Sequence, residues 1–385
     1  MTDNQMPTTM GQLIAQLDAE GICDHRRYAA VRRYLNFKAR KKNYPITGSF
    51  ELTPLCNFNC PMCYVHLQKE QMNGKKLLTV EQWKDIMQQA IDNGLMYASL
   101  TGGECLTYPG FKELYLFLQN KGIELNVLSN GSLMDAEMVS FLKKNPPALV
   151  QITLYGSSDE NYERVTGRRA FHVVWDNIEA LDSAGIPVKI AITPNAYMQD
   201  GKEVIRLLHQ KGYPFAINAG LMQPRKETQR GLFDANRNAY IEMFRLSREL
   251  NGMQVESECD VQNLPLTGVE NEIAESEKLV KGVSCGGGRS CFSVDWQGGM
   301  RPCNAFPCEP EDVLTLGFAE AWKRTNQKAR DFLRPVECED CAYKKQCKHC
   351  AAEHASGAPI GHANPEICAW RKQMSIEGLL ELQEP

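Results

Sequence analysis

The chain has 385 residues, of which 43% are hydrophobic and 23% are charged, and its formal net charge at pH 7 is −4. This length predicts two to three domains, and the composition excludes a chain that is disordered throughout. The charge excludes a globally basic nucleic-acid-binding protein. No apolar run is long enough for a transmembrane helix, and the N-terminus lacks the features of a secretory signal. We therefore expect a cytoplasmic protein that binds neither nucleic acid nor membrane.

Residues 1–45 are predicted to be mostly helical. This segment contains a dense group of eight basic residues: Arg26, Arg27, Arg32, Arg33, Lys38, Arg40, Lys41 and Lys42. Two interpretations are open, a solvated helix face or a docking surface for an acidic peptide.

From residue 49 onward, predicted strands alternate with predicted helices. The strands are expected at 49–53, 97–101, 124–128, 149–155, 188–193 and 215–219. The helices are expected at 79–93, 111–121, 135–144, 171–184 and 201–211. Thr79 and Gln82 resemble a capping box, and glycines stand where helices should end. The alternation predicts an α/β fold with a parallel sheet curved into a full or partial barrel, although periodicity alone does not distinguish a barrel from a doubly wound sheet.

The rest of the chain has a different composition. Residues 221–284 are interpreted as a bridging region with a helix near 234–251, between a barrel at 46–220 and a small domain at 285–385. That last region is rich in Cys, Gly and Pro, which is typical of a domain whose core is replaced by metal clusters. A helix is expected at its C-terminal end.

Fifteen cysteines in a reducing compartment favour metal ligation over disulfides. Cys56, Cys60 and Cys63 form a C-x3-C-x2-C motif directly after the first predicted strand, where α/β proteins place their chemistry. Zinc would need a fourth ligand. A 4Fe–4S cluster accepts three cysteines and leaves one iron open to a substrate or cofactor. The isolated Cys23 and Cys259 are expected to be small buried residues.

The three-cysteine motif, with Gly102-Gly103-Glu104 after the second strand, resembles the radical SAM superfamily over about residues 46–220. The resemblance implies a partial (β/α)6 barrel of TIM type. It also implies a cluster whose open iron binds S-adenosylmethionine, and reductive cleavage of that cofactor to a 5′-deoxyadenosyl radical. An electron donor of flavodoxin or ferredoxin type would supply the reducing electron.

The resemblance also assigns cofactor-binding residues. Met62 occupies a position where the family usually has an aromatic residue against adenine, and it can give a soft apolar contact there. Gly102 and Gly103 permit close backbone approach. Glu104 and the neighbouring backbone can accept hydrogen bonds from the amino group of the cofactor.

Three further positions resemble cofactor contacts. Asn130 and Thr153 follow the third and fourth strands, near the family positions for the ribose and carboxylate, and Arg164 is a candidate for the carboxylate. Each could equally be an ordinary turn or surface residue. Cys105 replaces the proline that often follows Gly-Gly-Glu; it is either a tolerated small residue or a reactive thiol at the barrel mouth.

The C-terminal cysteines resemble the SPASM extension of radical SAM peptide-modifying enzymes, over about residues 283–372. That resemblance implies two auxiliary 4Fe–4S clusters, and therefore three clusters in all. One would be held by Cys285, Cys291, Cys303 and Cys350, and the other by Cys338, Cys341, Cys347 and Cys368. The gap before Cys350 is shorter than usual by one residue. A zinc ribbon at 338–350 is the alternative. Cys308 is not assigned as a ligand of either auxiliary cluster.

SPASM enzymes act mostly on ribosomal peptides or proteins. Sulfatase-maturing members carry an Asp base directly after the third extension cysteine, whereas this chain has Asn304, and a neutral amide does not accept a proton at pH 7. We therefore expect oxidative thioether or carbon–carbon crosslinking of a peptide or protein rather than sulfatase maturation.

Two enzymatic alternatives stay open. The first is a peptide epimerase in which Cys308 or Cys105 returns a hydrogen atom, and the second is a tetrapyrrole-type small-molecule oxidase. An iron–sulfur electron carrier is disfavoured by the Gly-Gly-Glu companion motif. Because only about 45 residues precede the predicted barrel, a leader peptide would be read by a separate protein or by the basic segment, unless the substrate has no leader.

Overall fold

The computed structural model describes residues 9–19, 24–67, 69–72, 74–218, 237–251, 282–283, 285–343, 347, 350–355 and 358–376. Its centre is a nine-stranded sheet with the strand order β6-β5-β4-β3-β2-β1-β7-β8-β9. The strands are β1 Thr47–Glu51, β2 Tyr97–Thr101, β3 Glu124–Ser129, β4 Leu149–Thr153, β5 Val188–Ile192, β6 Phe215–Ile217, β7 Cys291–Val294, β8 Gly299–Arg301 and β9 Glu311–Asp312.

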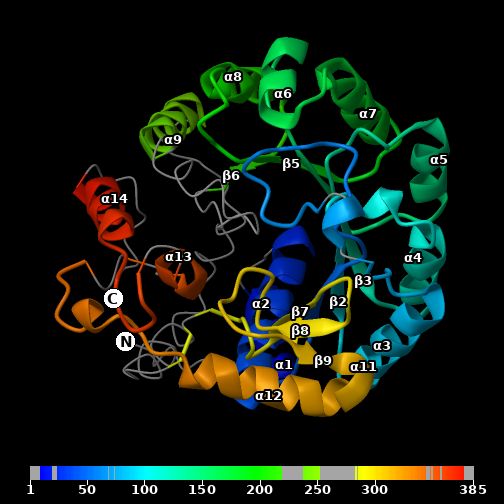
Figure 1. The fold of residues 1–385 in the computed structure, drawn as a ribbon, viewed down its shortest axis with the longest axis vertical. Helices are drawn as coiled ribbons and strands as arrows, with labels where there is room; N and C mark the ends of the chain where they lie inside the picture. Colours follow the sequence, from blue (N-terminus) through cyan, green and yellow to red (C-terminus); the bar gives the residue numbers. More distant parts are fainter. Residues whose placement is uncertain are drawn as a thin grey trace.

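Strands β1 to β6 pair in parallel in chain order. The intervening helices form an outer arc around the curved sheet (Figure 1). They are α3 Val80–Asp92, α4 Phe111–Asn120, α5 Ala136–Lys144, α6 Asp159–Thr166, α7 Phe171–Ser183 and α8 Gly201–Lys211. The predicted α/β fold and partial barrel are confirmed, and α6 is an element that the sequence analysis missed.

Helix α3 illustrates why these segments fold as predicted. Thr79 and Gln82 form the expected capping box at its start, which satisfies backbone N–H groups that have no partner within the helix. Trp83, Ile86 and Met87 lie on one face and are fully buried against the sheet. Each such side chain contributes about 1.5–3 kcal/mol through burial.

The sheet continues beyond the predicted barrel. β7 pairs in parallel with β1, where Cys291 lies opposite Thr47, and β8 and β9 extend the sheet in antiparallel fashion. Helices α11 Val313–Leu316 and α12 Phe318–Asp331 follow. Phe318 and Trp322 of α12 pack edge-on against Phe292 of β7. The cysteine-rich region is therefore joined to the barrel through a shared sheet.

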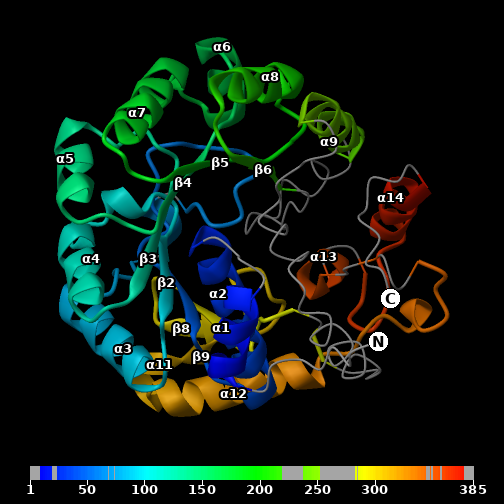
Figure 2. The same ribbon diagram turned by 180° about the vertical axis from the view of Figure 1, so that it is seen from behind.

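The N-terminal segment is helical, as expected, with α1 Met10–Ala19 and α2 Asp24–Lys42. Both helices lie across the back of the barrel (Figure 2). Arg32 of α2 pairs with Glu124 at the start of β3, and its guanidinium lies 4.7 Å from the ring centroid of Tyr97 at the start of β2. These contacts place α2 against the amino ends of the strands.

Three helices complete the described fold: α9 Arg237–Asn251, α13 Ala351–Ala355 and α14 Pro365–Ile376. α9 corresponds to the helix expected near 234–251, and α14 to the expected C-terminal helix. α13 and α14 lie to one side of the barrel (Figure 1). Most of the predicted bridging region lies outside the described residues, as do Cys23 and Cys259. None of the helices in the described ranges is long and apolar enough to cross a membrane.

Candidate functional site

The cysteine loop after β1 is locked to the turn after β2 by backbone hydrogen bonds. The Gly103 N–H donates to the Thr53 carbonyl over 2.7 Å, and the Glu104 N–H donates to the Leu55 carbonyl over 2.9 Å. A Cβ on Gly102 would lie 2.5 Å from the Thr53 carbonyl oxygen. One on Gly103 would lie 2.5 Å from that of Leu55. Both glycines are therefore required by this close approach.

The thiols of this loop affect one another's pKa values. Burial, together with the nearby charges of Glu104 and Cys63, raises the pKa of Cys56 to about 12. Burial also raises the pKa of Cys60 well above its usual value, with added effects from Cys63 and Cys56. Because buried thiols hold their protons, binding a cluster here requires those protons to leave.

Several N–H groups point at these sulfurs. Cys56 Sγ accepts from the Phe58 N–H over 3.3 Å and from Asn130 Nδ2 over 3.6 Å. Cys63 Sγ accepts from the His66 N–H over 3.2 Å. Such donors stabilise thiolate ligands and tune iron–sulfur clusters. The donor set therefore fits an iron–sulfur cluster.

Within the described ranges, no three His, Cys, Asp or Glu side chains are placed to hold a single metal ion. A four-iron cluster makes a different demand, because each cysteine binds a different iron atom and the sulfurs stand further apart. Three cysteines suit a four-iron cluster with one open iron, whereas a structural zinc ion takes four protein ligands.

Glu104 is buried, with 1% of its surface exposed. Its carboxylate accepts from Ser129 Oγ over 3.0 Å, from the Asn130 N–H over 2.7 Å and from the Leu106 N–H over 3.1 Å. These contacts hold the Glu104 side chain at the end of β3. The expected contact of Glu104 to the amino group of the cofactor stays a prediction.

Asn130 supports the cysteine loop. Its Nδ2 donates to Asn57 Oδ1 over 2.8 Å, and its Oδ1 accepts from the Ser132 N–H over 2.9 Å. Asn57 in turn donates to Ser132 Oγ over 2.8 Å. The turn after β3 is thus tied to the residue next to Cys56.

The other predicted cofactor residues lie on elements beside the loop. Met62 is buried in the main core. Thr153 ends β4, and Arg164 is on α6, where it donates to Asn161 Oδ1 over 2.8 Å and to Gln199 Oε1 over 2.6 Å. The end of α6 contacts the loop, since the Asn59 N–H donates to the Thr166 carbonyl over 2.8 Å. The cofactor roles of Met62, Thr153 and Arg164 stay predictions.

Tyr155 is a site residue that the sequence analysis missed. Its hydroxyl lies close enough to the thiol of Cys60 to lower the pKa of that thiol slightly against the larger effect of burial. Its ring packs edge-on against Phe58 and Tyr162, at centroid distances of 6.5 Å and 6.0 Å. Its position just after β4, at the carboxyl end of the sheet, was the available signal.

Cys105 is fully buried in the core. Its thiol donates to the Leu128 carbonyl over 3.3 Å, and burial raises its pKa well above its usual value. This position agrees with a small core residue, and the role of Cys105 as a hydrogen donor stays an untested prediction.

The cysteines of the first C-terminal set lie close enough together to affect one another's pKa values. Burial raises the pKa of Cys303 to about 12, with contributions from Cys285 and Cys350. Cys291 is likewise affected by burial and by Cys285. Cys350 therefore lies with its predicted partners despite the short gap before it.

The cysteines of the second C-terminal set also affect one another's pKa values. Burial raises the pKa of Cys338 to about 11, and Cys368, Cys347 and Cys341 add to the effect. Cys368 and Cys341 also act on Cys347. The grouping matches the two predicted ligand sets, while the clusters themselves stay a prediction.

Cys308 stands apart from both sets. After burial, the groups that act most on its thiol are Lys328, Arg301, Glu311 and Glu309, and its carbonyl accepts from Arg301 Nε over 3.3 Å. This environment favours a spare thiol over a substitute ligand.

Tyr64 joins the cysteine loop to the first C-terminal set. Its hydroxyl lies beside the Asn304 side chain, and its pKa is raised to about 12 by burial and by the charges of Glu51, Cys63 and Cys303. The sequence analysis singled out Asn304 but not Tyr64. The two predicted cluster sites therefore face one another through this pair.

Comparisons with known proteins agree with this geometry. The sequence profile of the radical SAM superfamily matches residues 50–208. The antilisterial bacteriocin subtilosin biosynthesis protein AlbA of Bacillus subtilis (strain 168) is 24% identical over 88% of this chain and 74% of AlbA. An AdoMet-dependent heme synthase of Methanosarcina barkeri (strain Fusaro / DSM 804) is 25% identical over 80% of this chain and 92% of that protein. Streptococcus suis SuiB, solved with precursor peptide SuiA, has a TM-score of 0.60 at 16% identity, covering 89% of this chain and 81% of SuiB.

Residues 50–208 therefore form a radical SAM domain, which binds S-adenosylmethionine and a 4Fe–4S cluster. The chain thus combines this domain with a cysteine-rich C-terminal region.

Proposed function

We propose that this protein is a SPASM-type radical SAM enzyme that oxidatively modifies a peptide or protein substrate by forming a thioether or carbon–carbon crosslink. The observation that carries the proposal is the cysteine loop locked to Gly102 and Gly103, with a second cysteine set joined to it through Tyr64 and Asn304. The printed names of AlbA and of SuiB with its precursor peptide support a peptide substrate.

The roles of the chain's own residues follow from this arrangement. Cys56, Cys60 and Cys63 would ligate the cluster, and Asn130 and Tyr155 would hold the loop around it. With S-adenosylmethionine and one electron from a flavodoxin- or ferredoxin-type donor, that cluster supplies a 5′-deoxyadenosyl radical that removes hydrogen from the substrate.

The C-terminal cysteine sets complete the proposal. Crosslinking removes a second electron and a proton from the peptide, so an electron acceptor is needed near the substrate. The set of Cys285, Cys291, Cys303 and Cys350, adjacent to the barrel through Tyr64, would hold one auxiliary cluster for this role, and the set around Cys338 would hold the other.

A second candidate is a tetrapyrrole side-chain oxidase. The similarity to the AdoMet-dependent heme synthase, which extends over most of both chains, favours it. Both candidates use the same radical chemistry, so the substrate distinguishes them.

The test uses anaerobically reconstituted protein with S-adenosylmethionine, dithionite and candidate precursor peptides in deuterated water. A crosslinking enzyme forms 5′-deoxyadenosine, and the peptide loses a pair of hydrogen atoms without gaining deuterium. Deuterium in the product would indicate epimerisation instead. Turnover of a tetrapyrrole but of no peptide would overturn the proposal in favour of the second candidate.

A further inference from the structure

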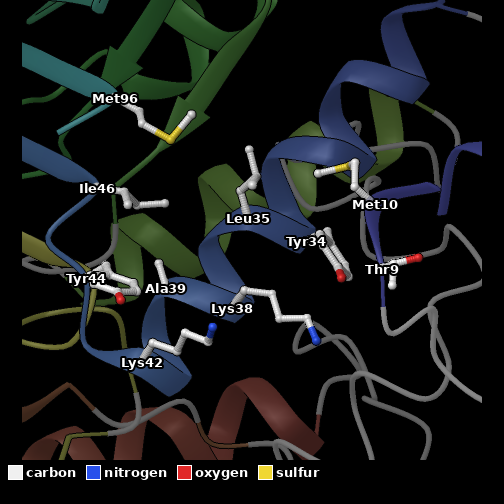
Figure 3. Close-up of a pocket in the computed structure, with 10 residues that line it drawn as sticks. All are labelled: Thr9, Met10, Tyr34, Leu35, Lys38, Ala39, Lys42, Tyr44, Ile46 and Met96. Atoms are coloured by element: carbon white, nitrogen blue, oxygen red, sulfur yellow. The ribbon is translucent and has the colours of Figure 1, made fainter. Parts of the chain in front are cut away.

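A cavity of about 460 Å³ lies on the back of the barrel, on the side opposite the cysteine loop. It is enclosed by the start of α1, by α2 and by residues that directly precede β1 and β2. Figure 3 shows α2 between Ile46 and Met96 on one side and Thr9 and Met10 on the other. The lining residues are Thr9, Met10, Tyr34, Leu35, Lys38, Ala39, Lys42, Tyr44, Ile46 and Met96.

The cavity is cationic. Lys38 and Lys42 are its only charged lining residues among those that the structure describes. Neither lysine forms an ion pair with any described side chain, whereas Arg27 and Arg32 of the same helix pair with Asp18 and Glu124. The two lysines are therefore available to an anionic partner.

The cavity also exposes apolar surface. Tyr44 and Met96 are 54% and 40% exposed, and Leu35 and Ile46 also line the cavity. Lys38 Nζ lies 5.3 Å from the centroid of the Tyr34 ring, a cation–π contact that holds the ammonium beside the apolar wall. A concave surface with cations beside apolar side chains complements a segment in which acidic and apolar residues are neighbours.

We propose that this cavity docks an acidic and apolar peptide segment of the substrate, away from the residue that is modified. The inference rests on the proposed peptide-modifying function. A peptide suits the site better than an anionic membrane, because the lining residues form a recess and a membrane binds to a surface that is not recessed.

The position of the cavity sets a length requirement. β1 has five residues, so the amino and carboxyl ends of the strand lie about 17 Å apart. Extended chain covers about 3.3–3.6 Å per residue, so the docked segment and the modified residue must be separated by at least about six residues.

The test measures binding by the full, reconstituted protein without S-adenosylmethionine, so its result does not depend on turnover. The probe is a short fluorescein-labelled peptide of alternating Glu and Leu, with Lys-for-Glu and Ser-for-Leu peptides as controls. The Lys38→Glu/Lys42→Glu variant should bind the probe about tenfold more weakly. The Lys143→Glu/Lys144→Glu variant carries the same charge change on α5 and should bind as the parent does.

Met96→Ser tests the apolar wall and should also weaken binding, and Lys38→Gln/Lys42→Gln serves if charge reversal prevents folding. Equal binding of the Glu-Leu and Lys-Leu peptides, or equal losses in the α2 and α5 variants, would overturn the proposal. So would selective binding of phosphatidylglycerol vesicles that depends on Lys38 and Lys42 without peptide binding. Probe binding that tightens about tenfold when residues 1–8 are removed would show that the chain's own N-terminus is the occupant, and would also overturn it. Failure of the proposed function is seen separately, as absence of 5′-deoxyadenosine.

Discussion

The side chain of Asn304 lies beside the hydroxyl of Tyr64, and each residue directly follows a predicted cluster ligand, Cys303 and Cys63. This pair thus brings the loop after β1 next to the loop after β8. A fold in which β7 joins the barrel sheet beside β1 brings these loops together. The cysteine loop is therefore bounded on this side by the C-terminal region.

This contact should appear as a coupling energy. A double-mutant cycle with Tyr64→Phe and Asn304→Ala should show a coupling of at least about 0.5 kcal/mol in the free energy of unfolding, as side chains in contact usually do. Iron content should stay unchanged in both single variants, because neither residue is a predicted ligand. Additive effects within error would show that the two side chains do not interact.

Gly103→Ala should destabilise the cysteine loop. Its Cβ would lie 2.5 Å and 2.6 Å from two backbone carbonyl oxygens, those of Leu55 and Pro54, so the main chain must shift at a cost of about 3 kcal/mol. Thermal unfolding and iron content after reconstitution should both fall. The matched control is Gly11→Ala, whose Cβ meets no atom closer than 4.0 Å and should leave both unchanged. An unaltered iron content in Gly103→Ala would contradict the need for this close approach.

The C-terminal cysteines should differ in their effect on iron. Cys303→Ser should lower the iron content by about four atoms per chain, the content of one cubane cluster. Cys308→Ser should leave it unchanged, because the groups acting most on Cys308 are charged side chains rather than cysteines. Iron analysis of the two purified proteins decides this. A loss of iron in Cys308→Ser would make Cys308 a ligand.

Cys105→Ala should act on stability rather than chemistry. The side chain is fully buried and its thiol bonds the Leu128 carbonyl, so its removal should cost about 1–2 kcal/mol. The yield of 5′-deoxyadenosine and the deuterium content of the product should match those of the parent. Deuterium that is present in the product of the parent and missing from the product of this variant would identify Cys105 as a hydrogen donor, and it would also contradict crosslinking.

The barrel elements could be predicted because each carries a local signal. The Thr79–Gln82 capping box and the repeated buried face of Trp83, Ile86 and Met87 are readable in sequence and present in the structure. β7 has only four residues, Cys291–Val294, which is too short for a period to emerge, and its pairing with β1 is a long-range contact. α12 was missed because the surrounding Cys, Gly and Pro residues obscured its own pattern.

The functional site likewise contains residues that could be predicted from the sequence and residues that could not. The cysteine motif was identifiable from its spacing, and the two glycines from the resemblance to the radical SAM superfamily. The direction of the Glu104 side chain was not, because it depends on Ser129 and Asn130, which follow a different strand. Tyr64 and Tyr155 were missed for the same reason, since their partners are distant in sequence.

The central claim is that Cys56, Cys60 and Cys63 hold the cluster that cleaves S-adenosylmethionine. The most direct test is the formation of 5′-deoxyadenosine by the Cys56→Ala/Cys60→Ala/Cys63→Ala variant under anaerobic reduction with dithionite. The account predicts that cleavage is abolished while iron remains in the C-terminal region. Persistent cleavage of S-adenosylmethionine by this triple variant would contradict it.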